Sequence, residues 1–222
     1  MTERAAEIRD VASSIRDLIE RFVATSAPQE VFEGVASELR AIAAKLAEYP
    51  QDHTFMGFPE AANAGGSGEE HEPEGPWDNS PVMGRANPLA PPLRLRLLED
   101  RVVGTVTFHG AYEGPPGHVH GGYVAAAFDE LLGLAQALGG QPGMTGRLTI
   151  HYRSPTPLDE ELRMEGRVER VDGRKCICVG TLHHGDTLLA EGEGLFVRID
   201  PERFQRMMQE RGIAPITPSD AP

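Results

Sequence analysis

The sequence predicts an α+β protein in which an antiparallel sheet wraps around one central helix, preceded by a helical hairpin. From Leu93 onward apolar and polar residues alternate, which is typical of half-buried strands. The stretch from Gly121 to Leu138 is apolar on almost every side, so we expect a buried helix there. The first 50 residues carry apolar side chains at helical spacing. A helix without a polar face needs cover on all sides, which predicts a sheet that curves around it.

Two amphipathic helices are expected in residues 1–50. The first covers residues 3–25, and its apolar stripe consists of Ile8, Val11, Ile15, Leu18, Ile19 and Phe22. Ser26-Ala27-Pro28 interrupts this pattern, and the second helix covers residues 29–48 until Tyr49-Pro50 ends it. Joined by a short turn, the two helices form a hairpin with an apolar face to bury, either on the main domain or on a partner chain.

Residues 51–80 are predicted to be a flexible linker. Positions 63–75 hold glycine, serine and glutamate without apolar periodicity, as linkers do. The proline-rich stretch 77–92 is expected to be an ordered but irregular approach to the main domain, which occupies residues 81–200. Residues 201–222 are expected to form a short helix over 201–211, with Pro201 at its start, followed by a tail.

Six strands are expected in the main domain: Leu93–Leu98, Val102–His109, Gly146–Arg153, Glu161–Val171, Lys175–His184 and Thr187–Ile199. Two turn pairs, Asp172-Gly173 and Gly185-Asp186, predict tight hairpins between the last three strands. Cys176 and Cys178 then point to the same face of their strand. We interpret them as small apolar side chains.

Composition argues against several functional classes. The net charge of −13, from 21 basic and 34 acidic residues, disfavours binding to nucleic acid, so we expect no such partner. Apolar runs stay far below the roughly 20 residues that span a bilayer, so we expect no membrane partner. The N-terminus MTERAAEIRD lacks the basic and apolar regions of a signal peptide, which predicts a cytoplasmic location.

Motifs of several enzyme classes are missing from the sequence. It contains no G-x-S-x-G nucleophile elbow, no P-loop and no G-x-G-x-x-G after a strand, so we expect no nucleotide cofactor. His118-Val119-His120 resembles a metal-binding pair, but no further ligand cluster completes a site. We therefore expect neither a metal nor any other cofactor.

The segment Gly114–Gly122 precedes the predicted buried helix and is the most informative stretch of the chain. A helix that starts with Gly121 and Gly122 offers free N–H groups at the positive end of its dipole. Such an end can stabilise a developing oxyanion. The competing interpretation is that these glycines only permit tight packing.

Asp129 and Glu130 lie inside the same apolar helix. Neighbours on a helix point about 100° apart, so at most one of these carboxylates faces a given pocket. A carboxylate in a buried helix is costly without a partner or a task. The alternative is a structural carboxylate that is hydrogen-bonded or lies at a wet edge of the helix.

The spacing of Gly121 and Asp129 constrains any shared chemistry. Eight residues correspond to about 12 Å along an α-helix, more than an aspartate side chain spans. If both groups act on one carbonyl, they must come from two copies of the helix. Two such helices running antiparallel bring each glycine end beside the other chain's aspartate. Catalysis here therefore requires a homodimer with two equivalent sites.

Over residues 81–199 the chain resembles the hotdog-fold acyl-CoA thioesterases, in particular the PaaI-like branch that includes the thioesterase superfamily members. The resemblance rests on His120-Gly121-Gly122, Asp129, Thr145 and Tyr152-Arg153-Ser154-Pro155, with strands on both sides of the helix. The helical hairpin lies outside it. The implied fold is a hotdog: an antiparallel sheet wrapped around a central helix.

The resemblance also implies catalytic roles. Gly121 would supply the oxyanion N–H, and His120 would stabilise the loop and hydrogen-bond near the thioester. Asp129 of the other protomer would act as general base for water or as nucleophile. Thr145 would position the water or the carboxylate.

Substrate-binding roles follow in the same way for Gly122 and Arg153, and for the hairpin Gly173-Arg174-Lys175, which in similar proteins approaches the nucleotide end of coenzyme A. One position departs from the pattern: similar enzymes often carry an amide side chain a few residues before His120, where this chain has Gly114, preceded by Glu113.

The leading hypothesis is an acyl-CoA thioesterase that hydrolyses a coenzyme A thioester to free acid and coenzyme A. The protein would be a homodimer or a dimer of dimers, with the acyl chain entering along Val124, Phe128 and Leu132. A non-catalytic acyl-CoA-binding regulatory or assembly module is the alternative. An enoyl-thioester hydratase ranks lower, because the D-x-x-x-x-H spacing of those relatives does not occur here.

Overall fold

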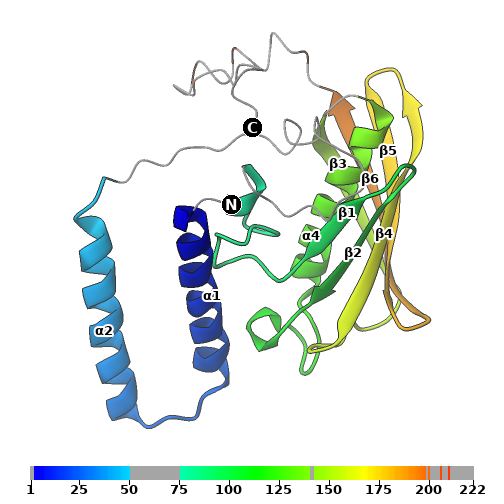
Figure 1. The fold of residues 1–222 in the computed structure, drawn as a ribbon. Coiled ribbons are helices and arrows are strands. Elements are labelled where there is room, and N and C mark those ends of the chain that lie inside the picture. Colours follow the sequence, from blue (N-terminus) through cyan, green and yellow to red (C-terminus); the bar gives the residue numbers. More distant parts are fainter. Residues whose placement is uncertain are drawn as a thin grey trace.

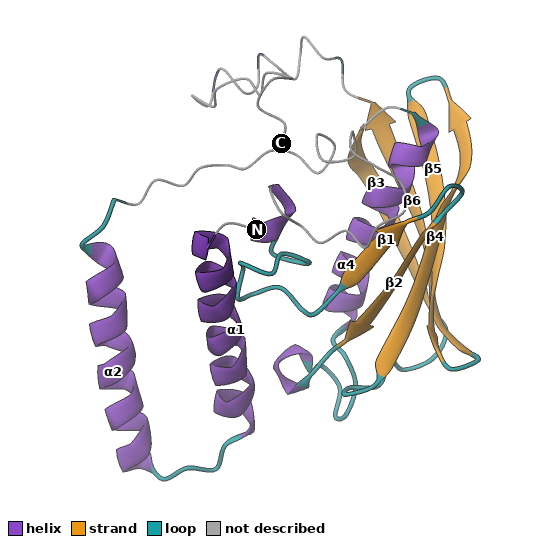
Figure 2. Ribbon diagram, in the orientation of Figure 1, coloured by secondary structure: helices purple, strands orange, loops and turns teal. Residues whose placement is uncertain are grey.

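The computed structural model describes residues 3–50, 76–140 and 143–198, together with positions 200, 206 and 210. Its main body is one antiparallel sheet curved around a helix, and two further helices stand beside it (Figure 1). Figure 2 shows one helix lying against the curved sheet and two helices standing apart from it. The predicted α+β plan, including the N-terminal hairpin, is confirmed.

The sheet has six strands in the order β1-β2-β4-β5-β6-β3. Their bounds are β1 Arg94–Leu97, β2 Val102–Thr107, β3 Gly143–Tyr152, β4 Glu161–Asp172, β5 Lys175–His184 and β6 Thr187–Arg198. All pairs are antiparallel, and the predicted hairpin turns have Gly173 and Gly185 at positive φ, 54° and 56°. Glycine suits these turns because it has no Cβ to clash. Strands β1 and β3 form the two edges of the sheet.

The central helix α4 (Gly121–Ala135) packs across the inner face of the sheet and continues as a 3₁₀ turn over Gln136–Gly139. Three glycines, Gly166, Gly180 and Gly192, pair with one another across β4, β5 and β6 beneath the helix. A Cβ at Gly192 would lie 2.5 Å from the Phe128 ring, and one at Gly166 would lie 2.9 Å from Leu131. This row of missing side chains lets α4 approach the sheet closely, which expels water from its large apolar residues.

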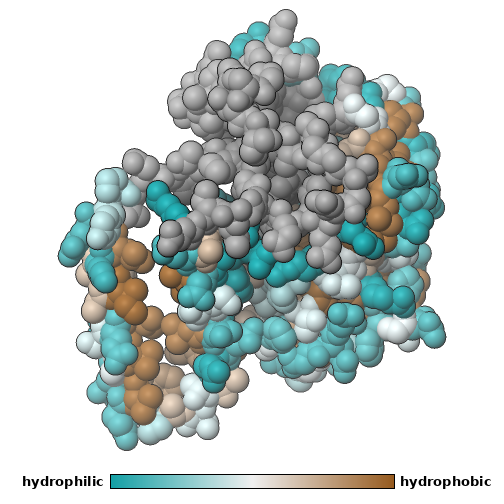
Figure 3. Space-filling view, in the orientation of Figure 1, coloured by the Kyte–Doolittle hydropathy of each residue, from teal (hydrophilic) through white to brown (hydrophobic). Residues whose placement is uncertain are grey.

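The helical hairpin consists of α1 (Glu3–Ala24) and α2 (Gln29–Ala47). Helix α1 is anchored to the main body by Arg9, whose guanidinium contacts both carboxylate oxygens of Asp78 at 3.0 Å. Arg16 adds a hydrogen bond to the Asn87 carbonyl at 2.9 Å. No residue of α2 is buried. Figure 3 shows apolar side chains along the sides of α1 and α2 that face each other.

Several expected details differ from the structure or lie outside it. The approach segment is not wholly irregular, because a 3₁₀ helix covers Pro76–Asn79. Most of the predicted linker, residues 51–75, and the C-terminal helix over 201–211 lie outside the described residues, apart from positions 206 and 210. Cys176 and Cys178 are buried free thiols on one face. None of the helices in the described ranges has the length and apolarity of a membrane span.

Candidate active site at the start of helix α4

His120 caps the N-terminus of α4. Its Nδ1 accepts the Gly122 N–H at 3.0 Å, and its carbonyl accepts the Tyr123 N–H at 2.9 Å. An accepting Nδ1 places the ring proton on Nε2, which is then a donor, and His120 is exposed as a whole. Within the described part of the chain, no hydrogen bond takes up the Gly121 N–H. This group is therefore the donor that the helix start offers to a ligand.

The loop before the cap fixes the position of His120. The His120 N–H donates to the Tyr112 carbonyl at 2.9 Å, and the Glu113 carboxylate accepts the Gly117 N–H at 2.6 Å. A Cβ at Gly114 would lie 2.7 Å from the His120 Cα, so the loop closes only with glycine there. Glu113 therefore holds the loop, and no side chain at position 114 takes the place of the amide found in similar enzymes.

Tyr152, at the end of β3, anchors the first turn of α4. Its hydroxyl donates to the Gly121 carbonyl at 2.7 Å. A Cβ at Gly121 would lie 3.1 Å from that same hydroxyl oxygen, so a bare glycine suits this position. Sequence reasoning included Tyr152 in a motif but gave it no role. The only available signal was a tyrosine beside Arg153 at a strand end.

A cavity of about 480 Å³ opens at this helix start. Most of the surface that lines it is apolar. Helix α4 contributes Gly121 and Val124 to the lining. The loop before α4 and the segment at the end of β3 contribute the rest: Pro115, His118, Val119, Tyr152, Arg153, Ser154, Pro155 and Thr156. Of the three residues expected along the acyl path, only Val124 lines the cavity. Phe128 and Leu132 are fully buried against the sheet, so that part of the expected path is wrong. Close packing on the sheet glycines leaves no room beside them.

Asp129 and Glu130 point to different neighbours, as their helical spacing predicts. Thr145 on β3 donates its hydroxyl hydrogen to Asp129 Oδ1 at 2.9 Å. Ser80 in the approach segment donates to Glu130 Oε1 at 3.0 Å. Asp129 is half-buried and does not line the cavity at Gly121. One chain therefore presents the free Gly121 N–H and the Asp129 carboxylate at two separate places on α4, about 12 Å apart along the helix axis.

The remaining predicted binding residues fall into two groups. Gly122 and Arg153 lie at the Gly121 end, where the Arg153 guanidinium is exposed and contacts Glu191 at 2.7 Å. The turn Gly173-Arg174-Lys175 lies between β4 and β5, beside the C-terminal end of α4. Arg174 there donates to the Arg198 carbonyl at 2.9 Å. A single chain thus keeps this turn away from its own Gly121.

Tyr112 lies beneath the cap and is held in an apolar setting. Its ring packs edge-on against Phe108 and Tyr123, with centroid distances of 5.7 and 4.8 Å. Burial, followed by the neighbouring Tyr123, raises the pKa of the Tyr112 hydroxyl to about 12. The phenol therefore stays neutral and serves as part of the packing that supports His120.

Comparisons with known proteins converge on one description. A model of the Thioesterase superfamily matches residues 116–191, which include α4 and the strands β3 to β5. A crystal structure of a thioesterase superfamily protein aligns with 86% of this chain and 90% of its own, at 37% identity and a TM-score of 0.74.

Two curated relatives match a shorter stretch. Acyl-coenzyme A thioesterase THEM4 of Xenopus laevis is 34% identical over 91 residues, 40% of this chain and 41% of that protein. Acyl-coenzyme A thioesterase THEM5 of Homo sapiens is 30% identical over 96 residues, 42% of this chain and 39% of that protein. The chain therefore spans about two fifths of the length of these relatives.

Proposed function

The chain belongs to the thioesterase superfamily, and we propose that it hydrolyses an acyl-coenzyme A thioester to the free acid and coenzyme A. The proposal is carried by Gly121, which lines the cavity at the start of α4 and whose N–H has no acceptor in the described chain. A thioester carbonyl that enters this cavity meets a fixed donor at the positive end of a helix dipole.

The reaction follows from the chemistry of these groups. Water attacks the thioester carbon while Asp129 takes its proton, and negative charge moves to the carbonyl oxygen. The Gly121 N–H stabilises this oxyanion, and the His120 Nε2–H is a second donor at the same helix start. Collapse of the intermediate breaks the carbon–sulfur bond, and the departing thiolate recovers the proton from Asp129. Direct attack by Asp129 on the carbonyl is the competing route.

Thr145 positions Asp129 in this scheme. Its hydroxyl hydrogen occupies one carboxylate oxygen at 2.9 Å, which leaves the other oxygen to accept a proton from water. Because Asp129 is attached to both α4 and β3 in this way, its rotamer is held by two elements. Such support keeps a general base within reach of its substrate.

A homodimer is part of the proposal, since one site needs Gly121 and Asp129 from different copies. Strand β3 supports it: this ten-residue strand is an edge of the sheet and is mostly exposed, with Met144 43% and Tyr152 54% accessible. An open edge of this length is suited to pairing with a second copy. Antiparallel pairing would also bring the turn Gly173–Lys175 towards the partner's helix start, where its cations suit phosphate. The expected dimer of dimers and cytoplasmic location stay predictions.

A binding module without turnover is the second candidate, and one observation favours it. At position 114 only glycine fits against His120, so this chain has no side chain there in the place of the amide that often helps to hold water in similar enzymes. Binding of coenzyme A without hydrolysis would be the result that selects this alternative.

The test is a hydrolysis screen over short, long and aromatic acyl-coenzyme A substrates, following thiol release, with wild type and Asp129→Asn side by side. We expect at least one class to be hydrolysed by wild type and spared by the variant. A single-turnover reaction in ¹⁸O-labelled water separates the two routes, because general-base catalysis places the label in the product acid at once. Absence of turnover with every class would contradict the proposed activity.

A further inference from the structure

Helices α1 and α2 each carry an apolar stripe with a heptad repeat. Along each stripe the spacing alternates between three and four residues: Ile8, Val11, Ile15, Leu18 and Phe22 on α1, and Phe32, Val35, Leu39, Ile42 and Leu46 on α2. This spacing is typical of helices that pack against other helices in bundles and coiled coils. We call the two stripes together the hairpin seam. The proposed hydrolysis uses none of its residues.

The main body contacts a different side of α1. Arg9 and Ala12 are buried there, with Arg9 paired to Asp78, and Arg16 donates to the Asn87 carbonyl. At 3.6 residues per turn, these three positions lie about 100° around the helix from the hairpin seam. One side of α1 therefore anchors the hairpin, and the seam is left to another contact.

The two helices do not bury the hairpin seam against each other. Figure 1 shows them standing apart, and over the described residues 3–47 they do not pack along their length. The Phe22 and Phe32 rings meet edge-on near the connecting loop, with centroids 6.0 Å apart. Seven large apolar side chains on the facing sides are 37% to 59% exposed: Ile8, Val11, Ile15, Phe22, Val31, Leu39 and Ile42. Closely packed helices, with axes about 8 to 10 Å apart, would cover them.

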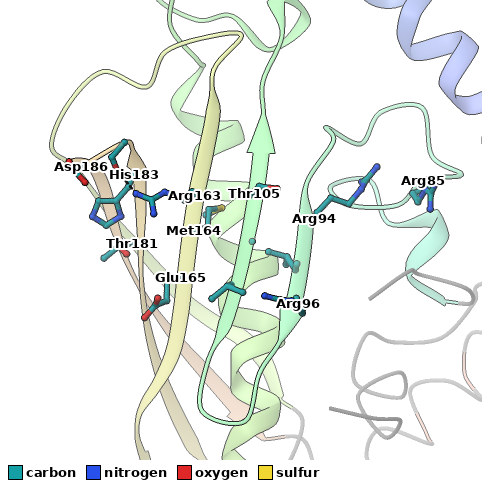
Figure 4. A pocket seen from close by; sticks show the side chains of 14 residues that line it. Arg85, Arg94, Arg96, Thr105, Arg163, Met164, Glu165, Thr181, His183 and Asp186 are labelled. Carbon is teal, nitrogen blue, oxygen red and sulfur yellow. Dashed lines mark hydrogen bonds between the residues drawn. The ribbon is translucent and has the colours of Figure 1, made fainter. Parts of the chain in front are cut away.

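The outer face of the sheet differs from the hairpin in character. Figure 4 shows a groove on that face whose labelled side chains are mostly charged or polar. Several of them already have partners within the chain: Arg163 donates to the Gly185 carbonyl, and Glu165 pairs with Arg101 at 3.7 Å. Apolar surface that calls for cover is therefore concentrated on the hairpin.

The area and charge of the hairpin suit a second copy of itself. At roughly 90 Å² each, the seven exposed side chains present about 600 Å² per copy, so two copies bury about 1,200 Å², which is the size of a small specific interface. Residues 3–47 hold eight acidic and six basic residues, a net charge of −2, so two hairpins repel each other little. A helix that lies on a membrane surface has a polar face rich in lysine and arginine instead.

We propose that the hairpin of a second copy packs on the hairpin seam, so that α1 and α2 of both copies form a four-helix bundle. Two helices with heptad stripes enclose no core, whereas four do. Each copy presents the same surface, as a closed two-fold interface requires. Helix α2, in which no residue is buried, gains the packing that an isolated helix of its length needs in water. The interface lies on the hairpin and does not depend on the proposed hydrolysis.

Photo-cross-linking of the full chain tests the interface, with p-benzoylphenylalanine in place of Phe22. Unlabelled and ¹⁵N-labelled copies are unfolded in urea, refolded together and illuminated, and mass spectrometry identifies the linked peptides. We expect cross-links from position 22 to α1 or α2 in which one peptide is unlabelled and the other carries ¹⁵N. Cross-links confined to peptides of equal isotope content would show that the hairpin closes on itself, and would overturn the proposal. Lack of any cross-link to either helix would also overturn it, because the seam would then belong to another kind of partner.

Matched variants place the interface on the hairpin seam. Leu39→Glu combined with Ile42→Glu is expected to lower the yield of mixed-isotope cross-links about tenfold or more, because carboxylates are costly in an apolar core. Ser37→Glu combined with Ala41→Glu is the control: both residues are exposed and lie on the side of α2 away from the seam, so we expect an unchanged yield. An undiminished yield in the seam variant, or an equal loss in the control, would contradict the proposal. Thiol release is measured separately, so an inactive protein with mixed-isotope cross-links would refute the hydrolysis alone.

Discussion

Thr145 donates a hydrogen bond of 2.9 Å to Asp129, and this contact joins the edge strand β3 to the central helix α4. The contact gives Asp129 a fixed rotamer at the open edge of the sheet. It also separates Asp129 from its neighbour Glu130, which is bound by Ser80 on another side of the helix. The two adjacent carboxylates therefore have different surroundings, and they provide a sharp test of the proposed chemistry.

Asp129→Asn is expected to lower kcat/KM for acyl-coenzyme A by about 10² to 10⁴, because the amide is too weak a base to take a proton from water. The substitution keeps size and shape, so the melting temperature is expected to change little. The matched control is Glu130→Gln, which alters the neighbouring carboxylate and should retain turnover per folded molecule. Equal losses in both variants would reject Asp129 as the specific base.

Thr145→Val is expected to lower kcat about tenfold to a hundredfold with a smaller change in KM, because it removes a hydrogen bond to a charged group. Thr145→Ser keeps the hydroxyl and should recover most of the rate. Steady-state kinetics of the two variants make the comparison. A serine variant as impaired as the valine variant would show that Thr145 acts through packing and not through its hydroxyl.

Gly121→Pro removes the proposed oxyanion N–H, and we expect a loss of kcat of about 10² to 10³. Gly121→Ala keeps the N–H and serves as control for the contact with the Tyr152 hydroxyl, which a Cβ would approach to 3.1 Å. If each site combines two chains, mixing Gly121→Pro chains with Asp129→Asn chains restores activity, because each heterodimer contains one intact site. Activity that stays at the level of the separate variants would contradict the shared site.

Arg9→Met is expected to destabilise the attachment of α1 by about 3 to 5 kcal/mol, because it leaves the Asp78 carboxylate buried without its main cation. Arg9 and Asp78 are only 7% and 8% exposed. Thermal unfolding followed by circular dichroism measures the loss, with the exposed Arg4→Met as control. The double variant Arg9→Met with Asp78→Leu should recover part of it. A double variant no more stable than Arg9→Met would show that the charge is not the cause.

Alkaline unfolding tests the raised pKa of Tyr112. Since its pKa is about 12 in the folded chain and about 10 when unfolded, the unfolded state releases the proton first. The stabilisation is fully present below pH 10 and is lost as the pH rises towards 12, up to about 2.7 kcal/mol at 1.36 kcal/mol per pH unit. Tyr112→Phe should lose less stability than wild type over this range in denaturant titrations. Parallel curves for both proteins would contradict the assignment.

Local pattern predicted most elements closely, because burial on one face imposes the strand and helix periods directly on the sequence. The last three strands and both hairpin turns agree with the structure within a residue or so. The central helix was predicted to reach Leu138, but α4 ends at Ala135 and a 3₁₀ turn follows. Periodicity does not separate these two helix types over a single apolar turn.

The sequence by itself determined the sheet, the buried helix and the separation of Gly121 from Asp129, since these depend only on residue order and helix rise. Tertiary structure alone decided which groups meet: the Thr145 hydroxyl with Asp129, and the Tyr152 hydroxyl with the Gly121 carbonyl. Such contacts join residues far apart in the chain, and strand order and register place them. No local pattern contains that information, because it arises only when the sheet closes around α4.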